Sequence, residues 1–261
     1  MDVLDLQGWT ALVTGAGQGV GREIAIQFAL HNAGAVVVND VNRDRAEAVV
    51  AEIEEAGGRA AAAVADVTDL AAVSDMVAEV NARFGSLDIL VSNAGNYGAD
   101  ASAVTFGEFW TIDPREWQPW VGVNFYGPIM CAHAALPGMV ERRRGRIITI
   151  VSDAGRVGEA GSEVYSAAKA GAAGFTRAIA RSVGRYDITA NNIAIAATRT
   201  PAVDEQLSDP GTLKRVMSKY VLRRPGEPSD IAPMVLLLAS AGGSWITGQT
   251  YPVNGGYSFA L

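Results

Sequence analysis

One tyrosine and one lysine stand four residues apart in a segment dominated by alanine, serine and glycine. The segment GSEVYSAAKAGAAG, residues 161–174, contains Tyr165 and Lys169. A helix brings positions i and i+4 onto one face, so both side chains would enter the same space. Free tyrosine has a pKa near 10, and a neighbouring ammonium stabilises the phenolate and lowers that pKa. The pair could therefore act as a general acid–base near neutral pH.

Such a pair has a simpler alternative, in which the tyrosine ring is half-buried and the lysine ammonium reaches water. The spacing alone does not separate the two interpretations, because short motifs match by chance. The choice between the two interpretations therefore depends on which elements position the pair and which residues those elements bring beside it.

Short apolar runs alternate with longer stretches of helical periodicity. The runs cover residues 10–15, 35–40, 61–67, 87–95, 145–152, 188–196 and 248–256. The helical stretches cover residues 21–32, 43–56, 70–84, about 114–143 and about 163–186. This alternation predicts an α/β fold, a Rossmann-type doubly wound parallel sheet of about seven strands with helices on both faces. Since no linker or repeat interrupts it, we expect a single domain over residues 1–261 with a dinucleotide-binding half at about 8–95.

Ligands of such sheets bind beyond the carboxyl ends of the strands, and small or polar residues follow several of these ends. The first strand leads into TGAGQGVG, residues 14–21, whose glycines allow a backbone to approach a pyrophosphate at a helix N-terminus. Asp40 ends the second strand, where a carboxylate would bind an adenosine ribose or, alternatively, cap the next helix. Asp66 ends the third strand and is available to the adenine. The fourth ends in SNAG, residues 92–95, and the fifth at Ser152.

Taken together, these motifs resemble the classical short-chain dehydrogenase/reductase family over essentially the whole chain. The family pattern T-G-x-x-x-G-x-G begins at Thr14, N-A-G begins at Asn93, and Y-x-x-x-K begins at Tyr165. The resemblance implies a catalytic set of Asn124, Ser152, Tyr165 and Lys169. It implies cofactor binding by Gly15, Gln18, Gly19, Val20, Gly21, Asp40, Asp66, Val67, Asn93, Ala94, Gly95, Tyr165, Lys169 and Thr200.

The chemistry expected of this set is hydride transfer between a secondary alcohol or ketone and a nicotinamide. Tyr165 would take the proton of the substrate hydroxyl, and Ser152 would hold the substrate oxygen. The family resemblance further implies that Lys169 bonds the nicotinamide ribose and that Asn124 supports a water. Two departures stand out: Ile195 and Ala196 replace the usual Pro-Gly, and Asn254 replaces a frequent Asp.

The cofactor expected is NAD, because the Asp40 carboxylate would repel the extra phosphate of NADP. The two positions best placed for a compensating cation hold the neutral residues Gln18 and Val41, and Arg43 and Arg45 are assigned to the surface of the next helix. An NADPH-dependent ketoreductase is the first alternative, and a nucleotide-binding sensor or scaffold without catalysis is the second.

Composition limits the possible partners. Hydrophobic residues make up 49% and charged residues 19% of the chain, which suits a large core, and the net charge of −7 argues against nucleic acid and anionic membranes. No run is long enough to span a membrane, and the start lacks a signal peptide. The single cysteine excludes an intramolecular disulfide, and with His133 it is too little for a metal site. We therefore expect a cytoplasmic protein with a small-molecule alcohol or ketone substrate and no metal.

Substrate and assembly are less closely defined. Aromatic residues between Gly95 and Trp117 could wall an apolar pocket or simply close the loop; they are Tyr97, Phe106, Phe109 and Trp110. Arg156 and Arg199 could meet a charged substrate or stay at the surface.

The Pro-bearing, charged segment at about 198–228 is predicted to be an irregular, mobile flap. Apolar residues on several faces of the Asn124 and Tyr165 helices predict a homotetramer, the assembly that the resemblance favours.

Overall fold

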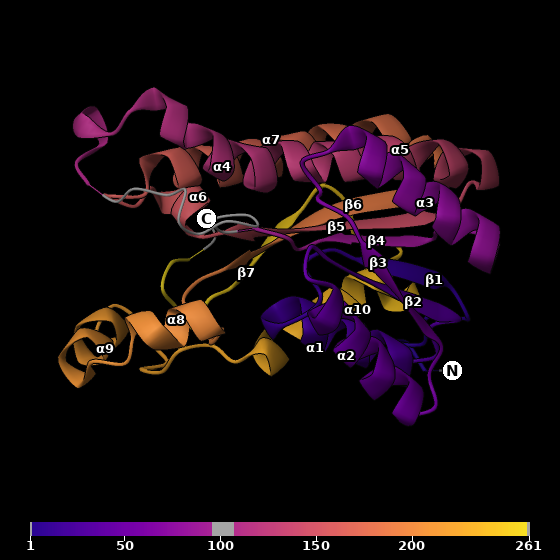
Figure 1. Ribbon diagram of the computed structural model, residues 1–261, viewed down its shortest axis with the longest axis horizontal. Coiled ribbons are helices and arrows are strands. Elements are labelled where there is room, and N and C mark those ends of the chain that lie inside the picture. The colour runs from indigo at the N-terminus through magenta and orange to yellow at the C-terminus, as the bar shows by residue number, and fades with distance from the viewer. Residues whose placement is uncertain (1, 96–106, 260–261) are drawn as a thin grey trace.

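The structure is a computed structural model that describes residues 2–95 and 107–259. Its centre is a seven-stranded parallel sheet in the order β3-β2-β1-β4-β5-β6-β7 (Figure 1). The strands are β1 Thr10–Val13, β2 Ala35–Asp40, β3 Ala60–Val64, β4 Ile89–Ser92, β5 Gly145–Ser152, β6 Ile188–Ile195 and β7 Thr250–Val253. The order runs outward from β1 in both directions, which confirms the predicted doubly wound Rossmann-type fold.

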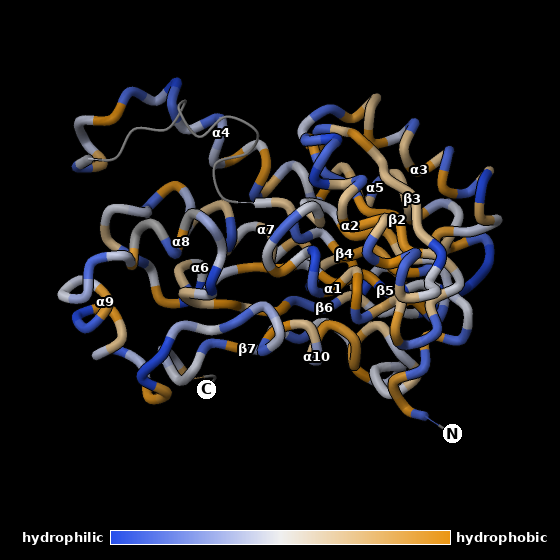
Figure 2. The backbone as a smooth tube through the Cα atoms, turned by 60° about the horizontal axis from the view of Figure 1, so that its bottom comes forward, coloured by the Kyte–Doolittle hydropathy of each residue, from blue (hydrophilic) through white to orange (hydrophobic). Residues whose placement is uncertain are grey.

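Helices cover both faces of the sheet, as the alternating pattern predicted. Figure 1 shows α3, α5 and α7 on one face and α1, α2 and α10 on the other. Their bounds are α1 Gly19–Leu30, α2 Arg43–Glu55, α3 Leu70–Phe84, α5 Gly127–Arg142, α7 Glu163–Val183 and α10 Pro228–Ala239. Two apolar cores result, one on each side of the strands, and the tube in Figure 2 is most hydrophobic where the central strands run. Among the described residues no helix is long and apolar enough to cross a membrane.

The long helix predicted at about 114–143 is broken into several pieces. A 3-10 turn at Pro114–Trp117 leads into α4, Gln118–Val121, and then into a π-helical turn at Gly122–Tyr126 before α5 begins. Pro128 has no N–H to donate to the Asn124 carbonyl, so one α-helical hydrogen bond is missing at this point. The wider turn carries Asn124, and π-helical turns of this kind are frequent at functional sites.

The segment predicted to be irregular contains two short helices, so that part of the flap prediction was wrong. They are α8, Pro201–Gln206, and α9, Pro210–Met217. Pro210 occupies the first turn of α9, where its missing N–H costs nothing, and Asp209 accepts a hydrogen bond from the Thr212 N–H at 2.6 Å. Proline and aspartate here start helices rather than interrupting them. The predicted mobility stays a prediction.

Candidate active site

The carboxyl ends of β1 and β4 are tied together by Thr14 and Asn93. The Thr14 hydroxyl accepts hydrogen bonds from the Asn93 and Ala94 N–H groups at 3.0 and 3.1 Å. The Asn93 side-chain amide donates to the carbonyls of Thr14 and Gly15 at 2.9 and 3.0 Å. Because β1 and β4 flank the point where the strand order reverses, these bonds shape the rim of the binding crevice.

Glycine is required where the loop after β1 turns toward β4. Gly15 has φ +60°, and a Cβ atom there would lie 2.8 Å from the Ala94 Cα. Both the left-handed backbone and the close approach exclude a side chain. The loop then opens α1, and Gly19 and Val20 at the start of this helix line the crevice. The N-terminus of a helix has unpaired N–H groups, which suit an anionic pyrophosphate. The residues present therefore fit a dinucleotide.

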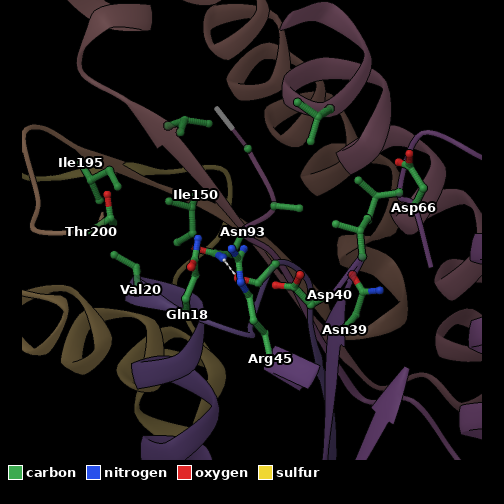
Figure 3. Close-up of a pocket in the computed structure, with 18 of the residues that line it drawn as sticks. Gln18, Val20, Asn39, Asp40, Arg45, Asp66, Asn93, Ile150, Ile195 and Thr200 are labelled. Atoms are coloured by element: carbon green, nitrogen blue, oxygen red, sulfur yellow. Dashed lines mark hydrogen bonds between the residues drawn. The ribbon is translucent and has the colours of Figure 1, made fainter. Parts of the chain in front are cut away.

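One elongated cavity follows this rim and takes in most of the predicted cofactor residues. It is lined by Gly15, Gln18, Gly19, Val20, Asp40, Asp66, Val67, Asn93, Ala94, Gly95, Tyr165, Lys169 and Thr200. In Figure 3 Thr200 and Ile195 lie toward one end, Asp40 and Asp66 toward the other, and Gln18 between them. Gly21 does not line the cavity; a Cβ there would lie 2.4 Å from the Asn93 Nδ2, so this glycine allows α1 to pack against the loop.

Asp40 is buried, and both of its carboxylate oxygens are held by backbone groups. Oδ2 accepts from the Gly17 N–H at 3.1 Å and Oδ1 from the Asn42 N–H at 3.0 Å. Asn42 caps α2, because its side chain accepts from the Arg45 N–H at 3.0 Å. The helix-capping alternative for Asp40 is therefore wrong; its carboxylate forms an Asx turn with the Asn42 N–H and also lines the cavity.

Arg45 lines the cavity in addition to being a surface residue of α2, which was not predicted from the sequence. Its side chain lines the same cavity as Asp40, and its Cβ lies 2.6 Å from the position that a Cβ at Gly17 would take. Arg45 lies on α2 and is exposed, as predicted, but the first turn of that helix also faces the glycine-rich loop, so Arg45 borders the cavity as well. The position of Arg45 on a helical wheel cannot reveal this contact, because the glycine-rich loop that faces α2 is remote from it in sequence.

The predicted pair on α7 lies at the inner wall of the cavity. Lys169 is buried and donates from Nζ to the Ile150 carbonyl at 2.9 Å, and Nζ lies 5.9 Å from the centre of the Tyr165 ring. A Cβ at Gly95 would lie 3.1 Å from both the Lys169 Nζ and the Asn124 Oδ1, so these polar atoms converge there. Burial lowers the pKa of Lys169 to about 8. The ammonium therefore still predominates at neutral pH.

Ser152 and Asn124 adjoin the cavity without lining it. Ser152 ends β5 opposite Ile195, a cavity residue on β6, and its hydroxyl accepts from the Ala154 N–H at 3.2 Å. Asn124 is buried in the π-helical turn and donates to the Trp120 carbonyl at 2.9 Å. The four residues of the predicted catalytic set therefore come from three elements that meet at one end of the cavity.

The segment without Pro-Gly is held by hydrogen bonds from the predicted flap. The Ala197 N–H donates to the Tyr220 hydroxyl at 3.0 Å, and the Ala197 carbonyl accepts from the Gly226 N–H at 2.9 Å. These two hydrogen bonds hold the backbone path after β6 in place, a role that the usual Pro-Gly would serve by restricting the backbone conformation. Thr200, which follows this path, lines the cavity.

Aromatic side chains stand beside Tyr165. The Trp120 ring meets the Tyr165 ring edge-on, with 5.6 Å between centroids, and Phe109 stacks on Trp117 at the same separation. Tyr97 and Phe106 lie outside the described residues. Trp120 was missed, although it lies one helical turn before Asn124 and so had to face the same region.

The two arginines considered for substrate binding are both engaged in ion pairs. Arg156 pairs with Asp153 at 2.6 Å, and Arg199 pairs with Asp204 and Glu227 at 2.7 and 3.0 Å. The positive charges of both arginines are thus balanced within the protein, so neither arginine indicates a charged substrate.

A parallel sheet with its crevice at the reversal of strand order, and a Tyr–Lys pair inside it, is typical of Rossmann-type oxidoreductases. The chain matches the family model described as enoyl-(acyl carrier protein) reductase over residues 15–258. It is 38% identical over 255 residues to (2S)-[(R)-hydroxy(phenyl)methyl]succinyl-CoA dehydrogenase subunit BbsD of Thauera aromatica, covering 98% of each chain. It is 38% identical to 3-oxoacyl-[acyl-carrier-protein] reductase FabG of Staphylococcus aureus, covering 95% of this chain and 97% of that one.

A solved structure of 7 alpha-hydroxysteroid dehydrogenase complexed with NADH and 7-oxo glycochenodeoxycholic acid superposes with a TM-score of 0.89. It is 34% identical and covers 98% of this chain and 96% of that one. The chain belongs to the short-chain dehydrogenase/reductase family.

Lys169→Met is expected to raise the melting temperature above that of wild type near neutral pH. This advantage of the variant should disappear at high pH. Burial lowers the pKa of Lys169 in the folded chain to about 8, below the 10.5 of an exposed lysine, so the charged lysine costs on the order of 3 kcal/mol below pH 8. Between these values the unfolded chain holds the proton that the folded chain has released, so wild-type stability rises with pH. Calorimetry from pH 6 to pH 10 should show the advantage of the variant shrinking.

Lys219→Met, which replaces an exposed lysine, is the matched control and should show no such trend. An advantage of Lys169→Met that grew with pH would mean that the fold stabilises the ammonium.

Proposed function

We propose that the protein is an NAD(H)-dependent oxidoreductase that interconverts a secondary alcohol and a ketone. The observation that carries this proposal is that one cavity is lined both by the firmly held Asp40 carboxylate and by the Tyr165–Lys169 pair. NAD, when bound, would accept the hydride that leaves the alcohol carbon. The remaining chemistry falls to the side chains of this chain.

The Tyr165 phenol would exchange a proton with the substrate oxygen, and the Lys169 ammonium would stabilise the phenolate in that exchange. Ser152 would donate a hydrogen bond to the same oxygen and oppose the charge that develops on it. The buried position of Lys169 strengthens its electrostatic effect, because few waters screen it. The cofactor would be held along the crevice by Gly15, Gln18, Gly19 and Thr200.

The aromatic residues beside Tyr165 support an apolar or ring-bearing substrate. Trp120 contacts the Tyr165 ring directly, so a substrate placed for proton transfer would also touch the Trp120 indole. The relatives' names include a phenyl-bearing thioester and a hydroxysteroid, both of which are bulky secondary alcohols.

A panel of alcohols tests the proposal. It contains 1-phenylethanol, cyclohexanol, a 7α-hydroxysteroid and a 3-hydroxyacyl-CoA, each with NAD and with NADP, and reduced nicotinamide is followed by absorbance. We expect turnover with NAD on at least one ring-bearing member. Binding of NADH without turnover of any member would favour the sensor or scaffold.

The NADPH-dependent ketoreductase remains a second candidate because Arg45 lines the cavity beside Asp40. A guanidinium there could pair with the additional phosphate of NADP. The Asp40 carboxylate is buried and held by two backbone N–H groups, whereas Arg45 is exposed, which is why the proposal places NAD first.

We further propose a cytoplasmic homotetramer. Large apolar side chains stand exposed on separate parts of the surface: Trp245 is 98% exposed, and Tyr126 in the π-helical turn is 45% exposed. These two side chains lie on different elements, so they could take part in two kinds of contact, as a tetramer with twofold axes needs.

Sedimentation velocity should show a species of four chains, each of 27.3 kDa. Trp245→Glu should shift it to a smaller oligomer, because a carboxylate cannot be buried unpaired in an apolar contact. Asp187→Asn, an exposed change elsewhere, should leave it intact. A monomer at all concentrations would contradict the proposal.

A further inference from the structure

A buried carboxylate follows directly after Ser152. Asp153 is 1% exposed and lies in the loop between β5 and the short helix α6, Ala154–Val157. Its Oδ1 accepts from Arg156 at 2.6 Å and its Oδ2 accepts from the Asn254 side-chain amide at 2.5 Å. The Asp153 side chain is not among those that line the cofactor cavity. Its burial therefore has to be explained by what it holds.

Both partners of Asp153 bind the carboxyl-terminal segment, residues 254–259. Arg156 donates to the Ser258 hydroxyl at 2.8 Å and to the Phe259 carbonyl at 3.1 Å. The Asn254 amide also donates to the Ser258 carbonyl at 2.8 Å, and its Oδ1 accepts from the Gly256 N–H at 2.9 Å. Asp153, Arg156, Asn254 and Ser258 thus form one connected network, called here the Asp153 network.

This network reaches the catalytic side chains through α6. The Ala154 N–H donates to the Ser152 hydroxyl at 3.2 Å. Gly155 packs so closely on α7 that a Cβ there would lie 2.7 Å from the Ala170 N and 3.0 Å from the Lys169 Cβ. The turn that orients Ser152 is therefore held between Lys169 on one side and the carboxyl-terminal segment on the other.

We propose that Asp153 is a positioning residue for Ser152, and that the Asn254 amide makes the carboxyl-terminal segment a structural part of the active site. The proposal rests on the proposed function, since it presupposes that Ser152 binds the substrate oxygen. It assigns a reason for an amide at position 254: an amide donates a hydrogen bond to the buried Asp153 carboxylate, which an ionised carboxylate at that position could not do.

Asn254→Asp would place two carboxylates within hydrogen-bond distance. Such a pair keeps one proton to a higher pH than a single carboxyl, and repulsion sets in when that proton leaves. The other titratable groups that face this region are Arg156 on α6, Glu159 after it, and Tyr220 and Tyr257. Arg156 offsets part of the repulsion, so the effect is graded rather than complete.

The test is the ratio of variant to wild-type kcat from about pH 5.5 to about pH 8.5, measured with the alcohol that gives the highest rate in the panel. For Asn254→Asp we expect a ratio near 1 at the acid end and a fall of about tenfold at the alkaline end, with the KM for NAD changed less than about twofold. The swap Asp153→Asn with Asn254→Asp restores one carboxylate and one amide and should return a ratio independent of pH.

Asn32→Asp is the matched control, because Asn32 also donates to a carboxylate, that of Asp5, at 2.9 Å but at an exposed site. A ratio for Asn254→Asp as flat as that of Asn32→Asp would overturn the proposal. So would a pH-dependent loss that the swap leaves uncorrected, because the carboxylate at 254 would then act without Asp153.

Amide hydrogen exchange at residues 153–157 gives a readout that needs no substrate. At about pH 8.5 the exchange, relative to wild type, should be faster in Asn254→Asp and normal in the swap; equal exchange in all three would also overturn the proposal. If wild type turned over no member of the panel, the proposed function would fail on that result, and the exchange data would still decide whether the Asp153 network holds the loop.

Discussion

Tyr165→Phe is expected to lower kcat by about 10²–10⁴-fold while changing the affinity for NADH by less than about twofold. The substitution removes the hydroxyl that exchanges a proton with the substrate and keeps the ring that packs against Trp120. Lys169 keeps its bond to the Ile150 carbonyl, so the cavity wall is preserved. Steady-state rates give kcat, and a fluorescence titration gives the affinity for NADH.

Tyr186→Phe serves as the control, since Tyr186 lies beyond the far end of α7 and contacts Arg143 and Arg185 instead of the cavity. It should leave both quantities unchanged. Turnover of Tyr165→Phe at the wild-type rate would remove Tyr165 from the chemistry and favour the sensor or scaffold.

The parts of this site that could be predicted from the sequence are those governed by local periodicity. The i, i+4 spacing placed Tyr165 and Lys169 on one face of a helix, and both line the cavity. Continuous apolar runs predicted the strands, because a parallel sheet buries both faces. The polar residues after those runs then had to gather at one edge of the sheet, which is why Asp40 and Asn93 could be placed together.

Features that depend on remote contacts were not predictable in the same way. Arg45 enters the cavity because the glycine-rich loop packs against the start of α2, and no local pattern in α2 records that contact. Asn254 and Asp153 meet across 101 positions of sequence. The break near Asn124 has a local cause in Pro128, yet helical periodicity on both sides concealed it. The helices α8 and α9 were missed because their prolines also suit loops.

The proposed preference for NAD rests on how firmly Asp40 is held. Its two oxygens accept from the Gly17 and Asn42 N–H groups, so the carboxylate cannot turn away from a ligand in the cavity. A second negative charge about 4 Å away costs about 1 kcal/mol in water and about 4 kcal/mol at an effective dielectric of 20. An intermediate cost of about 3 kcal/mol is about a hundredfold in affinity. Arg45 lines the same cavity and offsets part of this cost.

We therefore expect kcat/KM to favour NAD over NADP by at least tenfold, measured with one alcohol and both cofactors. Asp40→Ser with Val41→Arg should narrow or reverse the preference, because it removes the repelling charge and adds a cation beside the ribose. Arg45→Ala should act in the opposite direction and widen the preference toward about a hundredfold. Equal kcat/KM for the two cofactors in the unmodified protein would mean that Asp40 does not meet the ribose. The NADPH-dependent ketoreductase would then become the better description, with Arg45 as the residue that binds the phosphate.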